Sequence, residues 1–96
     1  MAEQFEVRNN EAESRFETIV EGNTAFAAYR RDGDRIIFTH TEVSEAMGGR
    51  GVASQLVRGA LDQVRRQKLT VVPQCAYVAA FIRRNPEYAD LVQAQP

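Results

Sequence analysis

Apolar and polar residues alternate along most of the first half of the chain, which is the pattern of half-buried β-strands. Phe16, Thr18 and Val20, for example, fall on one face of such a segment. The alternation is interrupted at stretches that contain Asn, Asp or Gly, and residues 31–34 give the strongest turn signal. Their Asp-Gly pair suits the positive φ of a tight hairpin. The pattern therefore predicts four strands, at residues 4–9, 15–20, 24–30 and 35–43.

The period changes in the second half of the chain. Apolar residues there recur at spacings of one, three and four, which is typical of one face of an amphipathic helix. They are Val52, Ala53, Leu56, Val57, Ala60, Leu61 and Val64. This periodicity predicts a helix over residues 51–67, a fifth strand over 69–73 and a second helix over 75–84, which Asn85-Pro86 ends. Residues 87–92 are predicted to add a last helical turn.

A long helix between two strands is a crossover connection, so the fourth and fifth strands should be parallel and joined right-handedly. The predicted fold is α+β, with a mixed, mostly antiparallel sheet, a long crossover helix and a short C-terminal helix. Residues 1–96 are expected to form a single domain, because 96 residues can bury one core but not two. Hydrophobic residues make up 44% of the chain and charged residues 26%, an ordinary globular balance.

Charge and composition exclude several classes of function. A net charge of −1 provides no excess of positive charge that would favour binding to nucleic acid. No apolar run approaches the length of a membrane span and no signal peptide is visible, so we expect a cytoplasmic protein without a membrane partner. The chain has one cysteine and one histidine, which cannot form an internal disulfide and cannot supply the usual four ligands of zinc. No metal site is expected.

The turn before the long helix is rich in glycine, with Gly48, Gly49 and Gly51 close together. A helix leaves its first amide groups unpaired, and glycine lets a ligand approach them, so an anion such as a phosphate is the expected occupant. The alternative is an ordinary glycine-rich turn, which is common before helices. The run is not a P-loop, since no Gly-Lys-Ser/Thr ends it, and it fits the dinucleotide-binding fingerprint poorly.

The fourth predicted strand carries the only histidine. Strict alternation places Ile36, Phe38, His40 and Glu42 on one face, and Ile37, Thr39, Thr41 and Val43 on the other. His40 and Glu42 would then lie on the same side of one strand, next to the glycine-rich turn, where they are candidates for chemistry. The alternative is a strand end exposed to solvent, where polar residues are common.

Three stretches in this order resemble the GNAT acetyltransferase superfamily, and more narrowly a small family of minimal GNAT-like proteins. They are His40-Thr41-Glu42-Val43, the loop from Gly48 to Ala53, and Pro73-Gln74-Cys75 with Asn85-Pro86-Glu87-Tyr88. The superfamily motif is Gln/Arg-x-x-Gly-x-Gly/Ala. Gly51 and Ala53 match its last two fixed positions, whereas Gly48 departs from the first. Together with the order of the elements, the resemblance covers nearly the whole chain.

The resemblance implies that the chain binds acetyl-coenzyme A. In such proteins the pyrophosphate lies on the amides of the glycine loop, which here comprises Gly48, Gly49, Arg50, Gly51, Val52 and Ala53. The pantetheine arm lies between the fourth and fifth strands and pairs with the backbone around Thr41 and Val43. This agrees with the interpretation of the loop as a phosphate site.

The resemblance also implies transfer of the acetyl group to an amine, assisted by a base and an acid. Glu42 could act as the base, directly or through water, beside His40. The tyrosine that usually protonates the leaving thiolate is absent, because Phe81 and Ile82 stand at the nearest positions. Cys75, at the start of the second helix, could take the acetyl group or act as the acid, or it could be an inert buried cysteine. Tyr77 and Tyr88 are further candidate acids.

The sequence therefore predicts an acetyl-coenzyme A-dependent N-acetyltransferase that acts on a small amine or on a protein or peptide amine. The alternative function, from another class, is a coenzyme A-binding module that senses or sequesters the thioester without transferring its acyl group. The chain is expected to be a monomer or a weak dimer.

Overall fold

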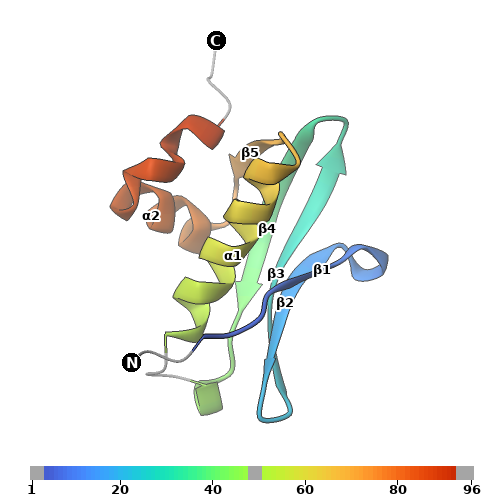
Figure 1. The fold of residues 1–96 in the computed structure, drawn as a ribbon, viewed down its shortest axis with the longest axis vertical. Coiled ribbons are helices and arrows are strands. Elements are labelled where there is room, and N and C mark those ends of the chain that lie inside the picture. Colours follow the sequence, from blue (N-terminus) through green and yellow to red (C-terminus); the bar gives the residue numbers. More distant parts are fainter. Residues whose placement is uncertain (1–3, 48–50, 93–96) are drawn as a thin grey trace.

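The computed structural model describes residues 4–47 and 51–92. The strands within this part are β1 (Arg8–Asn10), β2 (Arg15–Val20), β3 (Asn23–Asp32), β4 (Arg35–Glu42) and β5 (Thr70–Pro73). The α-helices are α1 (Val52–Arg66) and α2 (Ala76–Arg84), and short 3-10 helices form at Glu11–Glu13, Glu45–Met47 and Pro86–Leu91. The predicted order of strands and helices is confirmed (Figure 1).

The strands form one sheet in the order β1-β2-β3-β4-β5. The first four strands pair antiparallel with their neighbours, and β5 pairs parallel with β4. The long helix α1 makes the connection between β4 and β5, as a parallel pair requires. The expected α+β class, with its mixed and mostly antiparallel sheet, is therefore confirmed.

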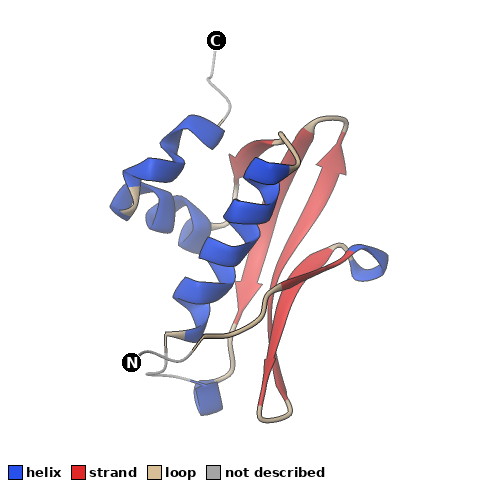
Figure 2. Ribbon diagram, viewed as in Figure 1, coloured by secondary structure: helices blue, strands red, loops and turns tan. Residues whose placement is uncertain are grey.

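The helices form a layer against one face of this sheet (Figure 2). Side chains from that face and from both helices make one continuous core, in which Phe16, Phe38, Leu56, Leu61 and Val78 are almost fully buried. Six of the seven apolar residues predicted to form one face of the long helix are buried in α1, and the seventh, Ala53, is half-buried. No α-helix among the described residues covers the opposite face of the sheet, which we call the open face.

The prediction of a first strand at residues 4–9 is wrong over most of that range. Only Arg8–Asn10 pairs with β2, and residues 4–7 instead run as an extended arm beside α1 (Figure 1). Two glutamine side chains hold the arm: Gln55 accepts from the Phe5 amide at 2.9 Å, and Gln63 donates to the Val7 carbonyl at 2.8 Å. Gly59 lies between these glutamines on α1, and an added Cβ there would be 2.7 Å from a Val7 methyl.

A bulge in β4 corrects the predicted face assignment. Tyr29 pairs with Phe38, but the preceding residue, Ala28, pairs with His40, so Thr39 is an extra residue in β4. An extra residue reverses the alternation. Ile36 and Phe38 point into the core, whereas His40 is exposed beside Ala28. His40 and Glu42 therefore lie on the open face and not on the face of Ile36 and Phe38.

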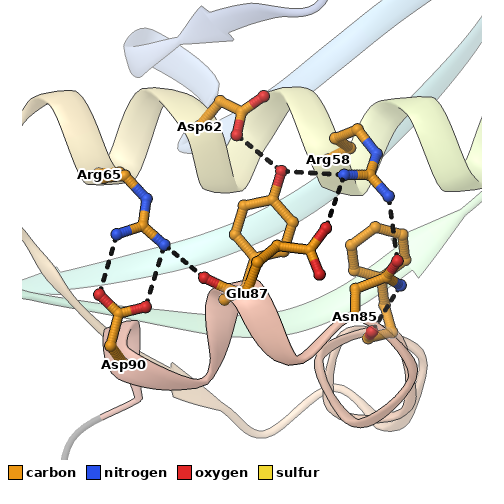
Figure 3. A network of polar contacts seen from close by, with 8 residues as sticks. Arg58, Asp62, Arg65, Asn85, Glu87 and Asp90 are labelled. Carbon is orange, nitrogen blue, oxygen red and sulfur yellow. Dashed lines mark hydrogen bonds and ion pairs between the residues drawn. The ribbon is translucent and has the colours of Figure 1, made fainter.

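A polar network fixes the C-terminal 3-10 helix on α1 (Figure 3). The Tyr88 hydroxyl donates to Asp62 at 2.7 Å and accepts from Arg58 at 3.3 Å. Arg65 makes two hydrogen bonds to Asp90, at 2.9 and 3.0 Å. The Arg58 guanidinium also lies over the rings of Phe81 and Tyr88, so polar and aromatic contacts hold the last segment together.

Candidate functional site

The two parallel strands, β4 and the edge strand β5, separate at one end. Pairing of β4 with β5 runs from Arg35 with Thr70 to Phe38 with Pro73. The Cys75 amide then donates to the Phe38 carbonyl at 2.8 Å, and the chain turns into α2. Thr39–Glu42 continues along β3, but within the described part of the chain no strand pairs with its other edge. This leaves a wedge with unpaired backbone groups on one side, suitable for an extended ligand.

Cys75 lies where the wedge closes. It is the N-cap residue of α2, is 8% exposed, and its sulfur lies 3.3 Å from the Thr41 hydroxyl oxygen. Thr41 pairs with the buried Ala27, so its side chain is on the side of the sheet that faces the helices. The structure thus joins Cys75 to Thr41, a residue that the sequence had suggested only for its backbone.

His40 and Glu42 occupy the other side of the same strand. Their side chains are 61% and 64% exposed, and His40 Nε2 lies 3.1 Å from Glu42 Oε2. The Phe26 ring is 6.1 Å from the imidazole and meets it edge-on. The two side chains lie side by side, as the sequence predicted, but Cys75 does not join them. A group at the unpaired β4 edge would have Cys75 and Thr41 on one side and His40 and Glu42 on the other.

The predicted phosphate site lies at the start of α1. Gly51 is the N-cap, with φ of +73°, no side-chain cap and open space where a Cβ would stand. Its carbonyl accepts from the Gln55 amide, so the amides of the first turn before Gln55 have no helical partner. These free donors and the helix dipole favour an anion. Val52 is buried and Ala53 half-buried beside this turn. Gly48, Gly49 and Arg50 lie outside the described residues.

Val43 follows β4 directly and packs partly against the core. Among residues 4–47 and 51–92, no three His, Cys, Asp or Glu side chains gather closely enough to hold a metal ion. Within the same residues, no helix combines the length and apolar character that crossing a membrane demands.

The tyrosines considered as acids differ in their surroundings. The Tyr88 hydroxyl is occupied by Asp62 and Arg58, and burial together with the bond to Asp62 raises the pKa of this phenol. Tyr77 is half-buried and packs against the core. Phe81 and Ile82 are buried. Cys75 differs from these two tyrosines because it lies where β4 and β5 separate, in contact with Thr41.

The chain is similar to known proteins over most of its length. Residues 15–91 match the family described as GCN5-related N-acetyl-transferase. The chain is 36% identical to Protein NATD1 of Bos taurus, and the alignment covers 97% of this chain and 75% of that protein. It is 35% identical to Protein NATD1 of Homo sapiens, with 97% and 75% covered.

A solved structure shares the fold. It is a GCN5-like protein from Staphylococcus aureus determined by NMR in solution, with a TM-score of 0.71 and 24% identity over 95% of this chain and 90% of that one. The five-stranded mixed sheet and its helices therefore have the fold of this GCN5-like structure. The chain belongs to the GCN5-related N-acetyltransferase family.

Proposed function

We propose that this protein is an acetyl-coenzyme A-dependent N-acetyltransferase acting on an amine. The observation that carries the proposal is the free edge of β4 beyond Phe38, where β5 has turned away and Cys75 closes the wedge. Amides and carbonyls on such an edge can pair with the amide groups of a pantetheine arm as a neighbouring strand would.

The residues on both sides of this edge fit coenzyme A. The backbone around Thr41 and Val43 would hold the pantetheine arm. The glycine loop from Gly48 to Ala53 would hold the pyrophosphate, and at Gly51 the space beside the backbone is open. Cytoplasmic localisation and a monomer or weak dimer belong to the same proposal.

The geometry supports direct transfer. The amine nitrogen attacks the thioester carbonyl carbon, a carbon–nitrogen bond forms, and the carbon–sulfur bond breaks. Glu42, beside His40 and open to water, takes the proton that the amine releases. Cys75 and Thr41 lie on the other side of the strand, where the Cys75 thiol can donate to the departing sulfur. Direct attack leaves no acetyl group on Cys75.

A second function remains, in which the wedge binds coenzyme A without transferring the acyl group. One observation favours it: the hydroxyl of Tyr88, the candidate acid on the C-terminal segment, is already engaged by Asp62 and Arg58. In this case Cys75, which is only 8% exposed, would be a packing residue.

The test combines binding with turnover. Calorimetry measures the affinity for coenzyme A, and a thiol reagent follows its release from acetyl-coenzyme A in the presence of a panel of amines. Amine-dependent release that Glu42→Gln lowers by about a hundredfold supports the enzyme. The matched control is Glu45→Gln, an exposed carboxylate in the 3-10 helix that follows β4. Tight binding without release for any amine supports the binding module, and no binding at all refutes both.

A further inference from the structure

The open face carries a hollow of about 370 Å³ near the turn between β3 and β4. Cationic and polar side chains surround two aliphatic ones in this hollow. The lining residues are Arg30, Arg31, Asp32, Arg35, Ile37, Val72 and Gln74. The transfer mechanism uses none of these side chains.

The floor of the hollow is apolar. Ile37 is only 8% exposed, yet it does not belong to the core that the helices cover. In the sheet it lies between Arg30 on β3 and Val72 on β5. Long arginine side chains can cover an aliphatic residue with their methylene groups while the guanidinium stays in water. The hollow thus combines an apolar floor with a cationic rim.

The charges in the rim do not cancel. Asp32 is the one carboxylate of the lining, and it is paired with Arg35, whose hydrogen bond and charge hold the pKa of Asp32 below its usual range. Arg31 donates to the Gly33 carbonyl at 3.1 Å. The Arg30 side chain makes no hydrogen bond or ion pair to any residue that the structure describes, although its charge also helps to lower the pKa of Asp32. Arg30 therefore offers an uncommitted guanidinium above an apolar floor.

The hollow is next to the proposed reaction centre. Arg30 pairs with Ile37 on β4, and Ala28, two residues earlier on β3, pairs with His40. Residues two apart on a strand share a face and are about 7 Å apart. The hollow and the His40–Glu42 pair therefore lie on the same face of the sheet, one side-chain repeat apart.

We propose that this hollow binds the anionic end of the acceptor, so that the substrate is an amine with a carboxylate or phosphate group beyond an apolar spacer. The inference rests on the proposed transfer at the β4 edge. A guanidinium recognises both kinds of oxyanion through paired hydrogen bonds. Ile37 and Val72 would pack against the spacer. The same arginines disfavour acceptors with a second cationic end, because like charges would meet there.

The experiment uses three probes of equal chain length: 6-aminohexanoate, 6-aminohexyl phosphate and hexylamine. Their affinities are measured by NMR on the uniformly labelled protein with coenzyme A bound, and turnover by release of the thiol. We expect the anionic probes to shift the amide signals of residues 30–37 and to bind at least about tenfold more tightly than hexylamine. Arg30→Gln should abolish this preference, whereas Arg83→Gln, an exposed arginine at the end of α2, should retain it.

Each outcome decides one question. A greater preference for the carboxylate or for the phosphate probe identifies the anionic group. Equal affinity for all three probes, or an unchanged preference in Arg30→Gln, overturns the inference about the hollow. If all three amines are nevertheless acetylated, the proposed transferase function stands. Selective anion binding at residues 30–37 without release of coenzyme A for any amine refutes the transferase, and with it the acceptor role of the hollow.

Discussion

The Thr41 hydroxyl oxygen lies 3.3 Å from the Cys75 sulfur, across the point where β4 and β5 separate. Either atom can donate in this contact. It is made by residues 34 positions apart in the chain, so it depends on the parallel pairing of the two strands. In the proposed site this contact orients the thiol toward the end of the wedge, while His40 and Glu42 remain on the open face.

Substitution of Cys75 separates a catalytic role from a packing role. Cys75→Ser should retain the fold, because Thr41 provides a partner for the introduced hydroxyl at the same place. If the thiol assists departure of the sulfur, turnover should fall by at least about tenfold, with unchanged affinity for coenzyme A. Thiol release and calorimetry measure the two quantities.

Three further experiments extend this prediction. Thr41→Val should lower turnover less than Cys75→Ser, since it removes only the group that orients the thiol. Full activity in a folded Cys75→Ala variant would show that the cysteine is a packing residue. Intact-protein mass spectrometry after incubation with acetyl-coenzyme A should find no acetyl adduct on Cys75; a stable adduct would favour a double displacement.

Two glycines provide a matched test of the phosphate site. Gly51 and Gly33 have φ of +73° and +60°, and an added Cβ would meet nothing within 4 Å at either position. Alanine at each should therefore lower the free energy of unfolding by a similar amount, about 1 kcal/mol, because of the left-handed backbone. Only Gly51→Ala should also weaken coenzyme A binding, by about tenfold or more, because the methyl group would occupy the ligand's approach to the first-turn amides.

Thermal unfolding and calorimetry on both variants check this prediction. Equal and unchanged affinity in Gly51→Ala and Gly33→Ala would place the phosphate elsewhere. A loss of affinity in both variants would instead indicate a general effect of lower stability, not a local site.

The sequence predicted the elements well where the apolar period was long and unbroken. The apolar stripe predicted the bounds of α1 to within one residue at each end. The two residues predicted in excess, Gly51 and Gln67, are its N-cap and C-cap. The arm at residues 4–7 was mistaken for a strand, since Phe5 and Val7 alternate with polar residues. Alternation indicates only that one side of an extended segment is buried. In this arm the buried side packs against α1 at Gly59 and not within the sheet.

The candidate site was predictable in part. Periodicity placed His40 beside Glu42, because the bulge lies before both residues and leaves their relative alternation intact. The bulge itself has no visible signal in Phe38-Thr39-His40, so the face that the pair occupies could not be predicted. The Cys75–Thr41 contact and the arginine hollow depend on strand register, which local patterns do not contain.

The close packing of Gly59 on the arm predicts an unusual response to alanine. In an isolated helix the change from glycine to alanine is favourable by about 1 kcal/mol. Here the new Cβ would lie 2.7 Å from a Val7 methyl carbon, so Gly59→Ala should destabilise the protein by about 1–3 kcal/mol as the arm is displaced. Faster hydrogen exchange of the Phe5 amide, now bonded to Gln55, should accompany the loss.

A double-mutant cycle tests the cause of that loss. Val7→Gly removes the three atoms nearest to the new Cβ, so the combined variant should be more stable than the sum of the two single losses implies. Strictly additive losses would show that the helix, and not the arm, responds to the substitution.

Glu17 should make the stability of the sheet depend on acid pH. It is 5% exposed and accepts hydrogen bonds from Arg15 at 2.9 Å and Asn10 at 3.2 Å. These bonds, led by that of Arg15, lower the pKa of Glu17 from 4.5 in the folded state. A lowered pKa means that the unfolded chain takes up the proton first as the pH falls. The contribution of Glu17 is therefore complete well above pH 4.5 and is lost progressively below it.

Glu17→Gln retains the shape of this side chain but removes its titration. At pH 7 the variant should be less stable than the wild type by about 1–2 kcal/mol, and the difference should shrink toward pH 3. Arg15→Gln removes the principal cause of the lowered pKa, so it too should reduce the loss of stability in acid. Urea unfolding at pH 7, 5, 4 and 3 measures each difference. A gap between wild type and Glu17→Gln that stays constant over this range would show that the hydrogen bonds from Arg15 and Asn10 do not favour the ionised form.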